Sequence, residues 1–461
     1  MKPLFLLLFA MCIPFPAWTH PTSIDKDGML KANGKRVFIL GLYQGAQDDA
    51  YAAEVADAGF NLIRCGSSKE DLDRAQAHGL QAWIPLGGVA VSNDKEAEQL
   101  KTVVDSWKNH PALAVWEGPD EILWNVWYSR WMNAEKRWNE VEQAFKKYKE
   151  THSSSGNPDT LHSQWLRYRQ TGRFALVEEV EESLRKVLEM PPANERLSEW
   201  RNYLDPLYEQ LERGTGIIRK ADPHHVQWFN HAPRNSMEDL TRFGTVADIV
   251  GCDIYPVPPD AVNGHSDLID KTITSVGAYT RRMAESAPGK PVWMVLQGFG
   301  WKDISEGGST ARPTYGQTRF MAYHAIVYGA RGILYWGTHS IERDSELWSD
   351  IKKVVSELDS LQPFLSAPDR TDDFGLVELP TSRSTDDRRV LFMAKERDGQ
   401  WAFIVVNEAD EATQFDLLGL EQLNGKTLDV LNENESLVVK DGRVTYGLPR
   451  RGASVLMIKD E

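Results

Sequence analysis

Between residues 37 and 365, short apolar runs alternate with segments whose apolar positions recur at helical spacing. The helical segments 48–58 and 69–78 stop at Gly59 and Gly79, and an apolar run begins directly after each glycine. This order of helix, glycine and strand is typical of repeated β–α units, in which parallel strands are buried between helices.

Eight runs have the length and apolar content of buried strands. They are 37–42, 60–65, 80–86, 113–117, 226–230, 247–254, 291–296 and 332–336. Because eight parallel strands close a barrel, the pattern predicts an α/β fold with a (β/α)8 TIM barrel over residues 28–365. Asn33-Gly34, a two-residue turn signal, predicts a hairpin that leads into the first strand.

The regular alternation is interrupted after the fourth strand. Residues 122–195 are highly charged and helical in pattern, and residues 196–220 read as the helix of the fourth unit itself. We therefore expect a helical insertion beside the mouth of the barrel. Two interpretations stay open: the insertion shapes a substrate cleft, or it is a solvated helical hairpin without a role in binding.

Residues 370–461 change in character to short alternating runs, such as 390–394 and 401–406, separated by Asp-Gly turns. They predict a C-terminal antiparallel β-sandwich. A stabilising domain is favoured over a sugar-binding one.

The first nineteen residues have the pattern of a signal peptide, with Lys2, an apolar run over 4–13, and Ala17 near its end. This predicts a secreted or periplasmic protein. Cys12 invites comparison with lipoproteins, but Met11 before it is too large for the usual lipid-attachment site. No later segment has the length and apolar content of a membrane span.

Composition narrows the classes of partner. The formal net charge is −15, which disfavours a nucleic-acid partner because no basic surplus exists to neutralise phosphates. The 11 histidines show no metal-binding spacing, and His224, His225 and His231 are expected to line a polar region, so no cofactor is predicted. Cys65 and Cys252 are expected to be buried thiols, with a disulfide left open. Oligomeric state is not predicted.

Polar and aromatic residues stand where the predicted strands end, which is where barrel enzymes carry their catalytic groups. They are Tyr43, Asp120, Glu121, Asn230, His231, Asp253, Tyr255, Gln297 and Trp336. Asp120-Glu121 follow Gly118-Pro119 after the fourth strand. An isolated pair of this kind usually caps a helix, but its place among eight strands favours catalysis. We predict Glu121 as a general acid/base and the pair as part of a carbohydrate-cleaving site.

The chain resembles the clan A (β/α)8 glycoside hydrolases over residues 28–365. The shared features are the Asn33-Gly34-Lys35 hairpin, the acid after the fourth strand, Tyr255-Pro256 at the sixth and Trp336 at the eighth. The resemblance implies that Glu121 is the acid/base, that Trp336 is the aromatic floor under a bound sugar, and that Tyr255 is a partner at strand six.

Two departures from the family pattern matter. Members have Asn before the strand-four Glu, where this chain has Asp120, and a nucleophilic Glu at the end of strand seven, where it has Gln297. A neutral amide cannot form a glycosyl ester. Three explanations stay open. In the first, Asp120-Glu121 resembles the Asp-Glu pair of barrel hexosaminidases, in which a substrate acetamido group attacks. In the second, Asp253 or Glu117 serves as base or nucleophile. In the third, the site only binds.

The sequence thus predicts a secreted glycoside hydrolase acting on an oligo- or polysaccharide, with Asp120, Glu121 and Asp253 as catalytic residues. Tyr43, Asn230, His231, Tyr255, Gln297 and Trp336 are expected to bind the substrate. The alternative is a non-catalytic carbohydrate-binding barrel with a degenerate hydrolase site.

Overall fold

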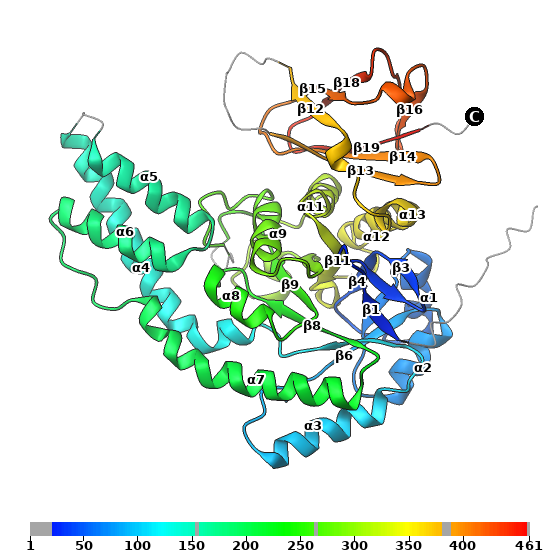
Figure 1. Cartoon of the computed structure of the whole chain (residues 1–461), viewed down its shortest axis with the longest axis horizontal. Coiled ribbons are helices and arrows are strands. Elements are labelled where there is room, and N and C mark those ends of the chain that lie inside the picture. Colours follow the sequence, from blue (N-terminus) through cyan, green and yellow to red (C-terminus); the bar gives the residue numbers. More distant parts are fainter. Residues whose placement is uncertain (1–20, 153–155, 262–265, 380–388, 459–461) are drawn as a thin grey trace, which may run out of the picture.

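The structure is a computed structural model that describes residues 21–152, 156–261, 266–379 and 389–458 (Figure 1). It comprises a barrel, a helical arm on one side, and a β domain packed against the barrel. The predicted signal peptide, residues 1–19, lies outside the described residues. In the part of the chain that is described, no helix is long and apolar enough to cross a membrane.

All eight predicted strands are present, and they form a closed parallel barrel, which confirms the predicted fold class. In chain order the strands are β4 (Ile39–Leu42), β5 (Leu62–Arg64), β6 (Gln81–Pro85), β7 (Leu113–Glu117), β8 (Val226–His231), β9 (Ile249–Ile254), β10 (Val292–Gln297) and β11 (Ala330–Trp336). Each pairs with its neighbour in sequence, and β11 pairs with β4 to close the ring.

Helices follow the strands and cover the outside of the barrel. They are α1 (Asp49–Asp57), α2 (Lys69–Ala77), α3 (Asp94–Trp107), α7 (Arg201–Ala221), α8 (Met237–Gly244), α9 (Ser275–Ser286), α10 (Trp301–Ile304), α11 (Tyr315–Val327), α12 (Glu346–Ser360) and α13 (Gln362–Leu365). Polar side chains satisfy the free N–H groups where several of them begin, as Ser68 does for α2 and Ser345 for α12.

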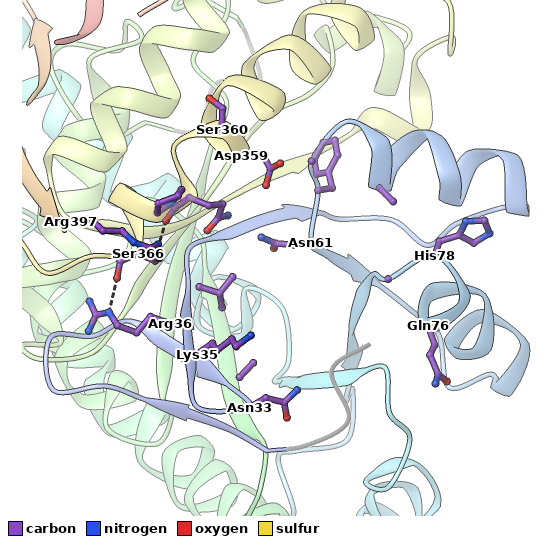
Figure 2. Close-up of a pocket in the computed structure, with 18 of the residues that line it drawn as sticks. Asn33, Lys35, Arg36, Asn61, Gln76, His78, Asp359, Ser360, Ser366 and Arg397 are labelled. Atoms are coloured by element: carbon purple, nitrogen blue, oxygen red, sulfur yellow. Dashed lines mark hydrogen bonds between the residues drawn. The ribbon is translucent and has the colours of Figure 1, made fainter. Parts of the chain in front are cut away.

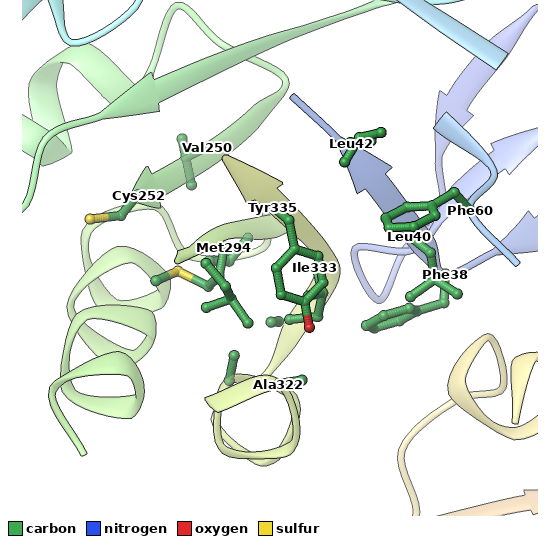
Figure 3. Packing of buried hydrophobic residues seen from close by; sticks show 14 of the residues in the cluster. Phe38, Leu40, Leu42, Phe60, Val250, Cys252, Met294, Ala322, Ile333 and Tyr335 are labelled. Atoms are coloured by element: carbon green, nitrogen blue, oxygen red, sulfur yellow. The ribbon is translucent and has the colours of Figure 1, made fainter. Parts of the chain in front are cut away.

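The outer face of the barrel strands packs against these helices through apolar side chains (Figure 3). Leu40, Met294 and Ile333 point outward from three strands and are fully buried. The inner face is filled differently. Trp83, Trp228 and Trp293 meet with ring centroids 5.4 Å apart in successive pairs. The interior is therefore a packed core and not a channel.

A small N-terminal sheet, β1 (Thr22–Ile24), β2 (Leu30–Ala32) and β3 (Lys35–Val37), covers the N-terminal end of the barrel. Its β2–β3 turn is the predicted hairpin, with Asn33 and Gly34 both at positive φ. The Thr22 hydroxyl donates a hydrogen bond to the carbonyl of Ala114 in β7, 2.7 Å away. The described residues of this sheet thus cover the N-terminal end of the barrel, opposite the carboxyl ends of the strands.

After β7, the chain forms the helical arm seen at one side of Figure 1. It consists of α4 (Ile122–Thr151), α5 (Asn157–Gln170) and α6 (Phe174–Val187), followed by a 3₁₀ turn (Leu197–Trp200) that leads into α7. The arm has its own apolar core, in which Trp131, Trp138, Trp165 and Phe174 are buried. It is thus a packed unit whose first helix begins at the barrel mouth.

The C-terminal residues form two antiparallel sheets that enclose a separate apolar core, as expected for a sandwich. One sheet contains β12 (Gly375–Glu378), β15 (Thr413–Leu418) and β18 (Arg443–Leu448). The other contains β13 (Val390–Arg397), β14 (Gln400–Asn407), β16 (Thr427–Val430), β17 (Ser436–Val438) and β19 (Ala453–Ile458). Partly buried polar contacts join the C-terminal domain to α11: Arg319 donates to the carbonyl of Ala453, and His324 lies 2.6 Å from Glu408.

A cavity of about 990 Å³ lies at the N-terminal end of the barrel strands (Figure 2). It is lined by the β2–β3 hairpin, the residues after α2 and the end of α12. Among the described residues that line it, Asp359 is the one carboxylate. One carboxylate provides no pair of acid and base groups, and the site residues predicted from the sequence stand at the opposite end of the strands.

Candidate active site

Four carboxylates converge at the carboxyl ends of the barrel strands. Glu117 is the last residue of β7, Asp120 and Glu121 follow it, and Asp253 is near the end of β9. Strand alternation directs Glu117 and Asp253 inward, on the same side as the three core tryptophans. The sequence Gly118-Pro119 ends β7, and the N–H groups of Gly118 and Glu121 donate to the carbonyls of Trp228 and Asn230, so this segment stays alongside β8.

Glu117 is completely buried and accepts hydrogen bonds from residues on β5 and β6 and from the residue after β4. Trp83 Nε1 lies 3.1 Å and Arg64 Nε 3.2 Å from its Oε2, and the Tyr43 hydroxyl bonds its Oε1. Burial raises the pKa of Glu117 to about 7, and the charge of Asp120 adds to this, while Arg64 and Tyr43 oppose it. With its oxygens occupied and no exposed surface, Glu117 positions Tyr43 and does not reach a substrate.

Asp120 is held through one carboxylate oxygen. Its Oδ1 lies 2.9 Å from Asn230 Nδ2 and 3.2 Å from the Tyr43 hydroxyl. Loss of hydration raises the pKa of Asp120, and these two hydrogen bonds oppose the rise. The residue has exposed surface, and its Oδ2 accepts no hydrogen bond from the described part of the chain. Asp120 is therefore fixed in orientation and has one oxygen available to a ligand.

Glu121 stands at the junction of the barrel and α4. Its backbone is left-handed, with φ 49° and ψ 32°, and its N–H donates to the carbonyl of Asn230 at 3.2 Å. It occupies the residue before α4, yet its side chain makes no capping hydrogen bond. The side chain is instead hydrogen-bonded to Asp253, so helix capping does not account for this carboxylate.

Glu121 and Asp253 are joined by a hydrogen bond between their side-chain carboxyl groups. Burial raises the pKa of Glu121 to about 7, the charge of Asp120 raises it further, and the hydrogen bond with Asp253 lowers it. Burial and the charge of Glu121 place the pKa of Asp253 well above its usual range. Since both acids resist ionising together, the pair keeps a proton close to neutral pH.

An aromatic wall faces this pair. Tyr255 is hydrogen-bonded to Asp253, and its ring stacks on Trp336 with centroids 5.3 Å apart and 20° between the planes. Phe299 contacts both rings edge to face. In the closed ring of strands, β11, which carries Trp336, lies four positions from β7, and thus across the barrel from Glu121.

Gln297, the residue at the family's nucleophile position, is fully buried and bonded to backbone. Its Oε1 accepts from the N–H of Val257 at 2.8 Å. Its Nε2 donates to the carbonyl oxygens of Val257 and Phe299 at 2.8 and 3.0 Å. Both donors of the amide are used, so Gln297 connects the loop after β9 to the loop after β10.

His231 lies apart from the other predicted residues. Asn230 points to Asp120 in the mouth, so His231, its neighbour in β8, points to the opposite face of the strand. It has no exposed surface, and burial lowers its pKa to about 4, so the ring is neutral. The structure therefore brings the predicted site residues together at the mouth, except His231, which faces away from it. Gln297 faces inward and is in register with Trp336, but it is buried and its amide is bonded to backbone.

Sequence reasoning missed Arg64 and Trp83, the two nitrogen donors to Glu117. The sequence does mark Arg64, because it is a charged residue at the carboxyl end of a buried strand, where the predicted site residues also stand. Trp83 had none, because an aromatic residue within an apolar run reads as core. Among the described residues no cluster of three or more His, Cys, Asp or Glu has metal-binding geometry. Cys65 and Cys252 are buried free thiols.

Restoring a carboxylate by Gln297→Glu is expected to destabilise the protein and to add no activity. The change removes two donors and sets a negative charge against two carbonyl oxygens, at a cost of about 3 kcal/mol. Because burial raises the pKa of such a carboxyl, the loss grows as pH rises above the unfolded pKa of about 4. Urea denaturation at about pH 5 and pH 8 measures this loss in the free energy of unfolding. Gln297→Met, which keeps the volume without a charge, should be destabilised equally at both pH values. A stable, more active Glu variant would contradict this role.

Comparison with known proteins places these features in a family. The family model Glyco_hydro_42, described as beta-galactosidase, matches residues 91–355, more than half of the chain and including all four carboxylates. No curated protein matches.

Solved structures share the fold at low identity. A beta-galactosidase from Bacillus circulans sp. alkalophilus is 8% identical, with a TM-score of 0.52 over 91% of this chain and 99% of that one. A glycoside hydrolase family 5 protein from Bacteroides vulgatus is 14% identical, with a TM-score of 0.53 over 97% and 95%. The predicted resemblance to clan A (β/α)8 glycoside hydrolases is confirmed. The chain is a glycoside hydrolase and belongs to the Glyco_hydro_42 (beta-galactosidase) family.

Proposed function

We propose that this enzyme hydrolyses β-galactosides, with Glu121 as the general acid/base. The observation that carries the proposal is the hydrogen bond between Glu121 and Asp253, which keeps a proton at the barrel mouth near neutral pH. The substrate class follows from the description of the matching family model. Cleavage of a glycosidic bond requires that the leaving oxygen receive a proton, and a carboxyl with a pKa of about 7 suits that step.

Asp253 assists Glu121 and does not serve as the second catalytic carboxylate on the other side of the glycosidic bond. Retaining enzymes hold the two carboxyl groups about 5 Å apart, and inverting enzymes hold them roughly 6.5–9.5 Å apart. Two groups joined by a hydrogen bond leave no space for an anomeric carbon or a water molecule between them. Asp253 therefore shares a proton with Glu121, and after Glu121 has protonated the leaving oxygen, the water that attacks the anomeric carbon returns a proton to the pair.

Asp120 is the carboxylate that remains for the anomeric carbon. Its Oδ1 is fixed by Asn230 and Tyr43, and its Oδ2 is available. In its ionised form, Asp120 stabilises the positive charge that develops on the sugar ring in the transition state. The stacked rings of Tyr255 and Trp336 offer an apolar surface on which the sugar lies.

A second candidate is hydrolysis of an N-acetylated sugar by substrate assistance. It is favoured by Gln297, an amide whose hydrogen bonds are all to backbone, at the position where relatives carry the nucleophile. In this case the acetamido oxygen attacks the anomeric carbon, and the free Oδ2 of Asp120 accepts the acetamido N–H.

Aryl glycosides distinguish the candidates. We expect aryl β-galactosides to be cleaved faster than the matching N-acetyl-β-hexosaminides, and the reverse order would establish the second candidate. Binding of both sugars in calorimetry, with no product after long incubation, would contradict both candidates and identify the degenerate binding site instead.

Glu121→Gln is expected to lower kcat about 10²- to 10⁴-fold on substrates with poor leaving groups, because protonation of the leaving oxygen is lost. Dinitrophenyl glycosides, whose leaving group needs no proton, should lose far less. Steady-state kinetics with both substrates measures the difference. Glu140→Gln, an exposed change on the same helix, is the control and should behave as wild type. Equal losses on both substrates would argue against acid catalysis by Glu121.

The value of kcat/KM should fall as pH rises through about 7, because the pKa of Glu121 is raised to about 7 and only the protonated acid is active. Asp120→Asn removes a negative charge that raises this pKa, so the alkaline limb of its residual activity should move to lower pH. Activity of Glu121→Gln on dinitrophenyl substrates should lack that limb. An alkaline limb that persists in Glu121→Gln would assign it to another group.

We also propose that the protein is exported. The support is the signal-peptide pattern of residues 1–19. Fractionation of producing cells, followed by N-terminal sequencing of the mature protein, tests this.

A further inference from the structure

We propose that one face of α4, formed by Trp124, Tyr128 and Met132, binds the leaving-group side of an oligosaccharide substrate. We call this face the α4 stripe. The inference rests on the proposed function, in which Glu121 protonates the glycosidic oxygen. It adds to that function a specificity surface for the sugars beyond the cleaved bond.

The stripe begins beside the proton donor. Its residues are spaced by four, so they lie above one another on the same face of the helix. From Trp124 to Met132 the helix rises about 12 Å, which is enough for two or three sugar units. Glu121 directly precedes the first residue of α4, so the acid and the stripe share one rigid element.

The stripe exposes apolar surface where a soluble protein usually buries it. Tyr128 is 48% and Met132 41% exposed. Both belong to the nine large apolar residues that are exposed in the described part of the chain, and both lie within the first eleven residues of α4. A third, Val126, is on the opposite face of the helix and does not belong to the stripe. Such a concentration marks a binding surface more often than a chance exposure.

The rings of the stripe are held in place next to the acid. Tyr128 packs edge to face on Trp124 at a centroid distance of 4.8 Å. The Arg234 guanidinium lies over Trp124, 5.3 Å from the ring centroid. Arg234 is also one of the charges that lower the pKa of Glu121, so it connects the first ring of the stripe to the proton donor.

The direction of the substrate follows from the barrel. The sugar that is attacked rests on Trp336, across the ring of strands from β7. The glycosidic oxygen must face Glu121 to receive its proton. The leaving group therefore extends from the mouth past Glu121, and the element beyond Glu121 is α4.

The chemistry of the surface fits a neutral sugar chain. Residues 122–129 contain no charged side chain, in a protein with 26% charged residues. Asn125 and Ser129 are exposed beside the apolar residues and provide hydrogen-bonding groups. Aromatic faces with uncharged polar neighbours suit the apolar faces and hydroxyl groups of sugars, and not an ionic partner.

The test compares kcat/KM for a β-linked galacto-oligosaccharide with that for nitrophenyl β-galactoside. Tyr128→Ala is expected to lower the ratio of the two values about tenfold, the effect of losing one aromatic contact at an interface. Trp124→Phe, which keeps an apolar ring against the arm, should lower it less. Val103→Ala, which shortens an exposed apolar residue on α3, is the matched control and should leave the ratio unchanged. Circular dichroism verifies that each variant is folded.

Three results would overturn the inference. An unchanged ratio in Tyr128→Ala would show that the stripe does not contact the leaving group. Equal losses on both substrates would show a general disturbance of the site. A shift from dimer to monomer in sedimentation, without a change in the ratio, would show that a second copy of the chain occupies the stripe. Glu121→Gln tests the proposed function separately, so failure of one does not decide the other.

Discussion

The burial of Glu117 is the interaction on which the barrel mouth depends. A carboxylate inside a barrel loses its hydration, and this loss is acceptable only if donors replace the water. Here the donors come from β5, β6 and the residue after β4, so one acid on β7 fixes the ends of three other strands. The Tyr43 hydroxyl also reaches Asp120, which places the next carboxylate relative to the core.

The four acids at the mouth differ in the groups that surround them. The charge of Arg64 lowers the pKa of Glu117, and the charge of Arg234 lowers the pKa of Glu121. The four acids cannot all be ionised at neutral pH, and the surroundings decide which one keeps the proton. Glu117 and Asp120 have hydrogen-bond donors that oppose the rise in pKa caused by burial. Glu121 and Asp253 are hydrogen-bonded to each other, and burial raises the pKa of both. Because the pKa of Glu117 is also raised to about 7, Glu121 differs from it in its place at the mouth and not in its pKa.

Much of this was accessible from sequence, for a physical reason. Parallel strands buried on both faces must be apolar throughout, so β4 to β11 appear as uninterrupted runs, and their ends identify Tyr43, Asp120, Glu121, Asp253 and Trp336. The sequence did not show where each side chain points or which group it contacts. The hydrogen bond between Glu121 and Asp253 joins residues far apart in the chain, and no sequence pattern marks the left-handed backbone of Glu121. Gln297 could be placed at the end of its strand, but not seen to be bonded to backbone.

The continuity of Glu121 with α4 has a mechanical consequence. A straight helix of 30 residues is about 45 Å long, and Glu121, the proposed proton donor, directly precedes its first residue. A small tilt of the arm about its base would rotate the backbone at Glu121 and change the distance of its carboxyl from Asp253. The distance between the Glu121 and Asp253 carboxyl groups therefore depends on the packing of the arm, through the tryptophans that hold α4 to α5 and α6.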